Sequence, residues 1–205
     1  MKNNFLNLAA VVFAVSLAIR AFPCSGQVLG PGDMVPGFSL PDVSGRLVSL
    51  SDYVNEKGVI IFFTSNSCPF ATGYEERMVA LHRRYAPEGF KVIAINPNDE
   101  KQQPEESIEK MKTRSVSAGF PFPYLKDRSG VCNSFGANRT PCVYLLERYG
   151  NGYRVVYTGA IDSQPIKTSA PNERYLENAI RSVLKSEPPM PARTDAVGCT
   201  IKFPK

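Results

Sequence analysis

One short segment of the sequence carries residue types that could do redox chemistry. Residues 64–69 (Thr-Ser-Asn-Ser-Cys-Pro) join an apolar run at residues 59–63 to a stretch with helical periodicity. Because proline favours the first position of a helix, Cys68 is expected at or near the helix N-cap. Unpaired backbone N–H groups and the helix dipole favour a thiolate there, and thiols in such positions are nucleophilic. The sequence therefore predicts that Cys68 is the reactive group of the chain.

Two other interpretations of Cys68 compete with this one. A small buried thiol with no chemical role is the plainer alternative, although a position between strand and helix argues against it. A hydrolase of the papain type would need a histidine beside the thiol. The one histidine, His82, lies along the same predicted helix, about 21 Å away at 1.5 Å per residue. The sequence therefore excludes a Cys–His hydrolase and places His82 at the surface or at the boundary of the core.

The elements around Cys68 form an α/β pattern. The continuous apolar run at residues 59–63 is typical of a strand that is buried on both faces. Apolar residues between Phe70 and Tyr85 recur at spacings of three and four, which predicts a helix over residues 69–85. Residues 90–95 (Phe-Lys-Val-Ile-Ala-Ile) follow as the next strand. Strand, helix and strand in this order make a βαβ unit, so the sheet is expected to contain parallel strands.

Further elements are predicted on both sides of this unit. Residues 38–50 favour a hairpin with its turn at Ser44-Gly45. Later segments predict a polar helix, an extended segment, a short helix, two strands that form a hairpin, and a final helix. Their expected bounds are residues 104–115, 121–125, 131–135, 141–146, 153–157 and 174–185. Pro-Pro and Pro-Ala pairs after Glu187 predict an irregular tail. We therefore expect a mixed sheet, with a βαβ unit first and a ββα unit last.

The first residues have the pattern of an export signal. Lys2 precedes an apolar run at residues 5–19, which has the length of a signal-peptide core and is short for a membrane span. Cleavage is expected between Ala21 and Gly26, and a retained membrane anchor is the alternative. Export would place the protein in the periplasm or outside the cell, where disulfides persist.

Cys24 lies within this N-terminal region and is not expected to carry a lipid. Lipoprotein processing needs small residues before the cysteine, and Phe22 and Pro23 stand there instead. Four cysteines follow residue 26, and the sequence does not choose among their three full pairings. No membrane contact is expected for the mature form. The predicted organisation is a signal peptide over residues 1–26, a domain over residues 27–186 and a tail over residues 187–205.

Composition excludes several classes of function. The 205 residues are 43% hydrophobic, which is enough to bury a core without metals. One histidine cannot support a histidine-rich zinc site, so no metal and no cofactor are expected. The formal net charge of +5 is small and no long basic run is present, so nucleic-acid binding is not expected. The composition is therefore compatible with thiol chemistry on a single α/β domain.

Several motifs of the chain resemble those of a known family. They are residues 65–69, Asn-Pro-Asn-Asp at residues 96–99, Gly-Ala-Asn-Arg-Thr-Pro at residues 136–141 and Gly-Ala-Ile-Asp at residues 159–162. On these motifs the chain is identified as a member of the thioredoxin-fold redoxin family, peroxiredoxin-like, of the alkyl hydroperoxide reductase/thiol-specific antioxidant type. Its ending, Gly-Cys-Thr-Ile-Lys at residues 198–202, resembles that of an exported subgroup with a Gly-Cys-Ser-Ile-Lys-like tail.

The resemblance implies a thioredoxin-like fold and a thiol-dependent oxidoreductase. A central mixed β-sheet would be flanked by helices, with the hairpin at residues 38–50 as an N-terminal extension. Pro141, after Thr140, would be the cis-proline that faces the active cysteine. Cys68 would attack a peroxide or a disulfide. The implied partners are a thiol, disulfide or peroxide substrate and a reducing protein.

The chain departs from the family's motifs at several positions. Many relatives carry Cys-x-x-Cys, and Ser65 stands at the first of these cysteines, so a dithiol cycle within the motif is impossible. Ser65 and Cys68 instead match the Thr/Ser-x-x-Cys of peroxiredoxins, in which the hydroxyl helps to orient the peroxide. Ile61 stands where peroxiredoxins want a proline. Peroxiredoxins also place an arginine near the position of Pro141, and Arg139 could replace it only with an inward-turned side chain.

The other cysteines are candidates for a second thiol. Cys142 follows the expected cis-proline and is a candidate resolving thiol, with a plain strand residue as the alternative. Cys199 lies in the tail, which could fold back over the site and supply a resolving or structural disulfide partner. Cys132 is predicted to be a buried structural thiol.

Two functional hypotheses from different classes follow. The first is an exported thiol-dependent oxidoreductase in which Cys68 becomes a sulfenate or a mixed disulfide and a second thiol resolves it. The second is a binding module with a thioredoxin fold whose redox motif has decayed. Ser65 favours the binding module, whereas the intact Cys68-Pro69 and Thr140-Pro141 pairs favour the enzyme. A copper carrier is disfavoured, because copper sites on this fold need a second cysteine and a histidine within reach.

Overall fold

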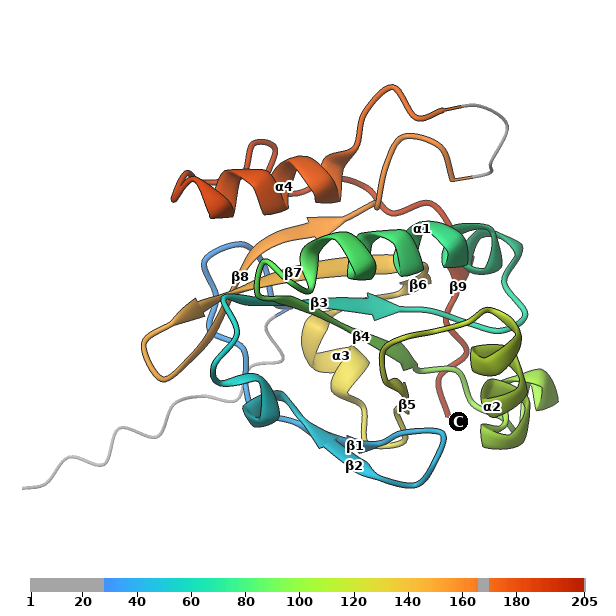
Figure 1. Cartoon of the computed structure of the whole chain (residues 1–205). Coiled ribbons are helices and arrows are strands. Elements are labelled where there is room, and N and C mark those ends of the chain that lie inside the picture. The colour runs from blue at the N-terminus through green and yellow to red at the C-terminus, as the bar shows by residue number, and fades with distance from the viewer. Residues whose placement is uncertain (1–27, 166–169, 205) are drawn as a thin grey trace, which may run out of the picture.

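The structure is a computed structural model of the chain, and it describes residues 28–165 and 170–204 (Figure 1). The export signal predicted at residues 1–26, with Cys24, lies outside the described residues. Within the two described ranges, no helix has both the length and the apolar character that a membrane crossing requires.

A five-stranded mixed sheet forms the centre of the domain, with the strand order β5-β4-β3-β7-β8. Strands β3, β4 and β5 run parallel, whereas β7 is antiparallel to β3 and β8 is antiparallel to β7. This arrangement confirms the predicted order of a βαβ unit followed by a ββα unit. The strands are β3 (Gly58–Phe63), β4 (Phe90–Asn96), β5 (Tyr124–Lys126), β7 (Cys142–Tyr149) and β8 (Gly152–Gly159).

Helices cover both faces of this sheet. Helices α1 (Pro69–Tyr85) and α4 (Tyr175–Leu184) lie on one face, and α3 (Val131–Phe135) lies on the other (Figure 1). The predicted N-terminal hairpin is present as β1 (Ser39–Pro41) and β2 (Leu47–Ser49), and the 3-10 helix η1 (Leu50–Tyr53) follows it. The fold is therefore the thioredoxin-like fold that the resemblance implied.

The polar helix predicted over residues 104–115 is two elements. They are the 3-10 helix η2 (Pro104–Glu106) and the α-helix α2 (Ile108–Ser117). Ser107 separates them because its backbone is extended (φ −66°, ψ 156°) and its side chain accepts a hydrogen bond from the backbone N–H of Lys110. The break turns η2 toward the loop that precedes α1.

Strand β3 shows how the core is divided. All six of its residues are buried, and successive side chains point to opposite faces of the sheet. Phe63 joins a cluster with residues of α3 and of the hairpin, whereas Phe62 joins a cluster with residues of α1 and α4. Burial on both faces explains why this segment is a continuous apolar run in the sequence.

The C-terminal tail is more ordered than the sequence suggested. Strand β9 (Cys199–Thr200) pairs antiparallel with β6 (Arg139–Thr140). The next residue, Ile201, is 3% exposed and packs into the same cluster as Phe63. A strand of two residues has no periodicity to detect, so this pairing could not be predicted from a local sequence pattern.

Candidate redox site

Cys68 lies where strand β3 leads into helix α1. Its backbone is extended (φ −80°, ψ 117°), and it is the N-cap residue, with Pro69 at the start of the helix. The side chain is buried, since Cys68 is only 3% exposed. The local sequence thus places the thiol at the positive end of a helix, as predicted.

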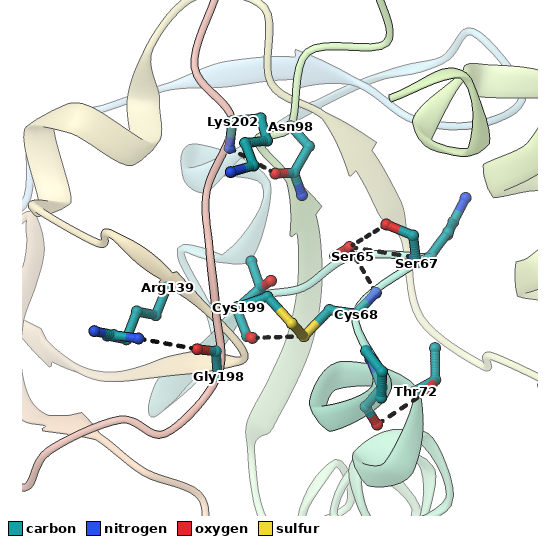
Figure 2. The surroundings of a disulfide bond; sticks show 12 residues. Ser65, Ser67, Cys68, Thr72, Asn98, Arg139, Gly198, Cys199 and Lys202 are labelled. Atoms are coloured by element: carbon teal, nitrogen blue, oxygen red, sulfur yellow. Dashed lines mark hydrogen bonds between the residues drawn. A yellow bond between two sulfur atoms is a disulfide. The ribbon is translucent and has the colours of Figure 1, made fainter. Parts of the chain in front are cut away.

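The tail supplies a covalent partner for this cysteine. Cys68 and Cys199 form a disulfide, with their Cα atoms 5.9 Å apart and their positions separated by 131 in the sequence (Figure 2). The pairing of β6 with β9 sets Cys199 directly opposite Thr140. The Sγ atom of Cys68 lies 3.0 Å from the carbonyl oxygen of Thr140, which can accept a hydrogen bond from the thiol after reduction. The peptide bond between Thr140 and Pro141 is cis, as the resemblance implied.

The two remaining cysteines of the described chain are free and buried. Burial raises the pKa of the Cys142 thiol to about 11, although a hydrogen bond with Thr158 opposes the shift. Burial also raises the pKa of the Cys132 thiol. Thiols with raised pKa values hold little thiolate near neutral pH, so neither is a strong nucleophile in this fold. Of the two candidate resolving thiols, the structure brings Cys199 to Cys68 and leaves Cys142 unpaired.

A buried glutamate that the sequence analysis missed organises the loop before α1. Glu106 of η2 is fully buried. Its carboxylate accepts hydrogen bonds from the Ser65 hydroxyl (2.5 Å) and the Ser67 hydroxyl (2.6 Å). It also accepts from the backbone N–H groups of Asn66 (2.9 Å) and Ser67 (3.1 Å) and from the side-chain amide of Asn96 (2.6 Å). One side chain therefore fixes three consecutive residues of the loop.

The same contacts determine the ionisation of Glu106. Burial alone would raise the pKa of this carboxyl, but the hydrogen bonds from Ser65, Ser67, Asn66 and Asn96 outweigh burial and hold the pKa below its ordinary value. Glu106 is therefore charged at neutral pH. Every polar group that faces it is a donor, so the network is satisfied only while the carboxylate is ionised.

Ser65 has its hydroxyl proton committed to this network. Its Oγ donates to Glu106 and accepts from the backbone N–H of Cys68 at 3.2 Å. A hydroxyl has a single proton, so Ser65 in this arrangement cannot also donate to a peroxide or to the Cys68 sulfur. The geometry gives Ser65 a role in holding the loop in place of the peroxide-orienting role that the resemblance implied.

Arg139 also differs from its expected role. The residue is exposed, and its Nη1 donates to the carbonyl oxygen of Gly198 at 3.1 Å. Figure 2 shows the guanidinium turned away from the disulfide. The inward orientation that a peroxiredoxin arginine requires is therefore not adopted in the disulfide form. Arg139 instead binds the tail.

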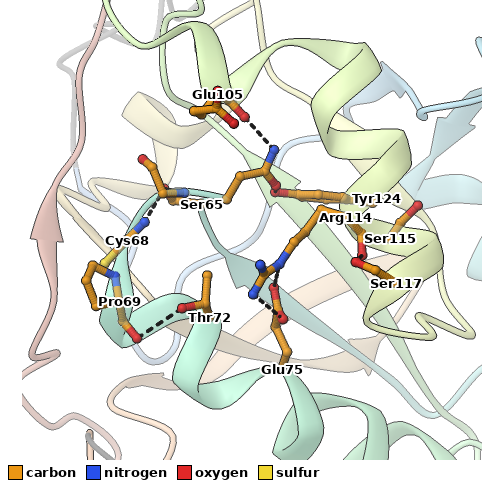
Figure 3. A network of polar contacts seen from close by, with 12 residues as sticks. Ser65, Cys68, Pro69, Thr72, Glu75, Glu105, Arg114, Ser115, Ser117 and Tyr124 are labelled. Carbon is orange, nitrogen blue, oxygen red and sulfur yellow. Dashed lines mark hydrogen bonds and ion pairs between the residues drawn. The ribbon is translucent and has the colours of Figure 1, made fainter.

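A second set of contacts holds the loop from the side of helix α2. Tyr124 Oη donates to the side-chain oxygen of Asn66 at 2.9 Å, and the Asn66 amide donates to the backbone oxygen of Glu105 at 2.7 Å. Arg114 of α2 and Glu75 of α1 form a bidentate ion pair, with both N–O distances at 2.7 Å (Figure 3). These contacts fix α1 and α2 on either side of the loop that carries Cys68.

His82 takes no part in the site. It is half-buried on α1, with its ring centroid 5.5 Å from that of Phe122. Burial lowers the pKa of His82, so it is neutral near pH 7. This agrees with the predicted position at the boundary of the core.

Comparisons with known proteins support a thiol redox family. Thiol-disulfide oxidoreductase ResA of Geobacillus thermodenitrificans is 29% identical over 137 residues, which cover 66% of this chain and 74% of that protein. A hypothetical protein of Sinorhizobium meliloti 1021 has a crystal structure similar to this chain, with a TM-score of 0.77 and 33% identity. The match covers 87% of this chain and 96% of that one.

A more distant structure shows the shared fold. A thiol:disulfide interchange protein of the thioredoxin family from Chlorobium tepidum TLS has a TM-score of 0.55 at 17% identity, over 77% of this chain and 99% of that one. The sequence profile of the AhpC/TSA family matches residues 31–160, which include the Cys68 loop and the cis-proline. The chain therefore belongs to the AhpC/TSA family, whose members are thiol-dependent oxidoreductases of thioredoxin-like fold.

Proposed function

We propose that the protein is an exported thiol-dependent oxidoreductase that cycles between a Cys68/Cys199 dithiol and the corresponding disulfide. The observation that carries the proposal is the disulfide between Cys68, at the N-terminus of α1, and Cys199 of the tail. The apolar run at residues 5–19 supports export, to a compartment in which such a disulfide persists.

The reaction with a disulfide substrate consists of two exchanges. The Cys68 thiolate attacks one sulfur of the substrate, forms a mixed disulfide and releases the other sulfur as a thiolate. The Cys199 thiolate then attacks the Cys68 sulfur, closes the internal disulfide and releases the second substrate thiolate. The substrate gains two electrons and the protein dithiol loses two. An external dithiol reverses the change in the protein by the same two exchanges.

Peroxide would be a slower substrate. Attack by Cys68 on a peroxide oxygen gives a sulfenic acid and releases water or an alcohol, and Cys199 then condenses with the sulfenic acid and releases one water. The peroxide needs a hydrogen-bond donor to polarise it. The Ser65 hydroxyl donates its hydrogen bond to Glu106, and Arg139 donates to the tail, which supports disulfides as the principal substrates.

Stoichiometric oxidation of the reduced protein tests the proposal. With 5,5′-dithiobis(2-nitrobenzoate) as the disulfide, wild type should release two thiolate equivalents, one at each exchange. Cys199→Ser should release one thiolate equivalent and retain a mixed disulfide on Cys68. Cys68→Ser should release no thiolate on the time scale of the wild-type reaction. Cys142→Ala is the matched control, since it removes a buried free thiol from the same region, and it should release two.

The outcomes separate the alternatives. Release of two equivalents by Cys199→Ser and of one by Cys142→Ala would assign the resolving role to Cys142. Unchanged release from Cys68→Ser would contradict the proposal and favour a binding module with a decayed redox motif.

A further inference from the structure

Residues 198–202 of the tail lie in a slot between residues 138–140 on one side and Asn98 and Asp99 on the other. Most contacts that hold the tail there are made to its main-chain atoms. On one wall, the Arg139 side chain donates to the carbonyl oxygen of Gly198, and the Ile201 N–H donates to the carbonyl oxygen of Asn138 at 3.0 Å. The pairing of β9 with β6 lies between these two contacts. Main-chain contacts of this kind are available to an extended peptide of almost any sequence.

The opposite wall of the slot is the segment that comes directly after the end of strand β4. The N–H of Lys202 donates to the side-chain oxygen of Asn98 at 2.9 Å, and the N–H of Asp99 donates to the carbonyl oxygen of Lys202 at 2.7 Å. Asn98 is held in turn by Lys126, whose Nζ donates to the backbone oxygens of Asn98 (2.6 Å) and Glu106 (2.8 Å). The slot is thus built on the same buried network that fixes the Cys68 loop.

At two positions of the tail, the slot restricts which side chain can be accommodated. A Cβ atom on Gly198 would lie 2.1 Å from the carbonyl oxygen of Thr140, so only glycine fits before Cys199 without a shift of the backbone. Two residues after Cys199, Ile201 is 3% exposed and packs into the core beside α3. Thr200, between them, is exposed. The slot therefore selects glycine before the cysteine and an aliphatic residue two positions after it.

We propose that this slot is the substrate site for an extended polypeptide segment of the form Gly–Cys–x–aliphatic, and that the tail is its intramolecular competitor. The inference rests on the proposed function and names its substrate class. With the tail in place Cys68 is 3% exposed, so a substrate sulfur reaches it only when the tail has left. The place of the Cys199 sulfur is then the place from which a substrate sulfur contacts Cys68.

Sharing one slot links the two exchanges. The Cys68 thiolate attacks the disulfide of the bound segment, forms the mixed disulfide with the segment's cysteine and releases the other substrate sulfur as a thiolate. For resolution, the segment leaves the slot while still joined to Cys68 by the mixed disulfide, and the tail returns in its place. The Cys199 thiolate then attacks the Cys68 sulfur in line with the mixed disulfide, and the segment departs on the opposite side with its cysteine as a thiolate. Resolution therefore depends on the segment having vacated the slot, because the tail and the segment cannot occupy it together.

Peptide probes that are added to the reduced, full-length Cys199→Ser protein test this inference. The probes are Val-Gly-Cys-Thr-Ile-Lys, which copies residues 197–202, and two variants with leucine for the glycine or aspartate for the isoleucine. Each cysteine carries 5-thio-2-nitrobenzoate in a mixed disulfide, and release of that thiolate reports attack by Cys68. The peptides are used at millimolar concentration, because a tethered competitor has an effective concentration of about that order.

The rates are compared with those of the same peptides and free dithiothreitol. Relative to this reference, the tail-sequence peptide should react with Cys68 at least about tenfold faster than either variant. The leucine would clash with the Thr140 carbonyl oxygen, and the aspartate loses the burial of an aliphatic side chain. Equal relative rates for the three peptides would overturn the inference, while a protein that still reacts with 5,5′-dithiobis(2-nitrobenzoate) would leave the proposed function standing. A protein that reacts with none of these reagents would contradict both.

Discussion

Glu106→Ala is expected to lower the free energy of unfolding by about 3 kcal/mol or more. The change removes the one acceptor shared by Ser65, Asn66, Ser67 and Asn96 and leaves their donors unpaired in a buried loop. Urea denaturation of the wild type and the variant measures the difference. Glu105→Ala is the matched control, because the neighbouring side chain is 64% exposed and has only a surface ion pair with Lys110 at 3.5 Å. The control should cost less than about 1 kcal/mol.

The same residue predicts the direction of a pH dependence. The pKa of Glu106 is lower in the folded protein than its ordinary value, so the unfolded chain binds this proton more readily. Its contribution to stability is therefore complete above the ordinary carboxyl pKa and is lost as the pH falls through the folded-state pKa. Wild type should lose more stability than Glu106→Gln as the pH is lowered from neutrality. Parallel pH profiles of the two proteins, or an Ala cost equal to that of Glu105→Ala, would contradict the role assigned to Glu106.

Gly198→Val is expected to slow closure of the Cys68–Cys199 disulfide at least about tenfold. The new Cβ would meet the Thr140 carbonyl oxygen at 2.1 Å, and this neighbour is backbone, so the tail must shift away from β6. A shift that costs about 1.4 kcal/mol already reduces the population of the closed tail tenfold. Rapid oxidation of the reduced protein followed by acid quenching and mass analysis gives the rate.

A second glycine-to-valine variant serves as the control for this experiment. Gly37 has no neighbour within 4 Å of an added Cβ, so Gly37→Val should close the disulfide at the wild-type rate. Closure at the wild-type rate in Gly198→Val would show that the tail reaches Cys68 without the β6–β9 pairing.

Much of the frame of this protein follows from local sequence patterns. The helix predicted over residues 69–85 matches α1, because its apolar residues repeat at helical spacing and Pro69 sets its first turn. Strand β3 is equally plain, because burial on both faces leaves no polar position in it. The position of Cys68 at the N-cap follows from these two elements.

The site beyond Cys68 depends on contacts that no local pattern encodes. Glu106 looks like an ordinary acidic residue at a helix start, and only the break at Ser107 turns it into the core. Cys199 lies 131 residues from Cys68, and its pairing depends on a two-residue strand and on the burial of Ile201. The sequence could therefore name Cys199 as a candidate but could not choose it over Cys142.

Differential alkylation of the full chain during oxidation tests the central claim most directly. The reduced protein receives a limiting disulfide oxidant, samples are alkylated at intervals, and the cysteines oxidised by then are reduced and labelled with a second mass. The redox pair predicts that Cys68 and Cys199 pass into the oxidised fraction together and in equal amounts, while Cys132 and Cys142 stay in the reduced fraction. Oxidation of Cys68 with Cys142, or a Cys199 that stays reduced while Cys68 is oxidised, would contradict it.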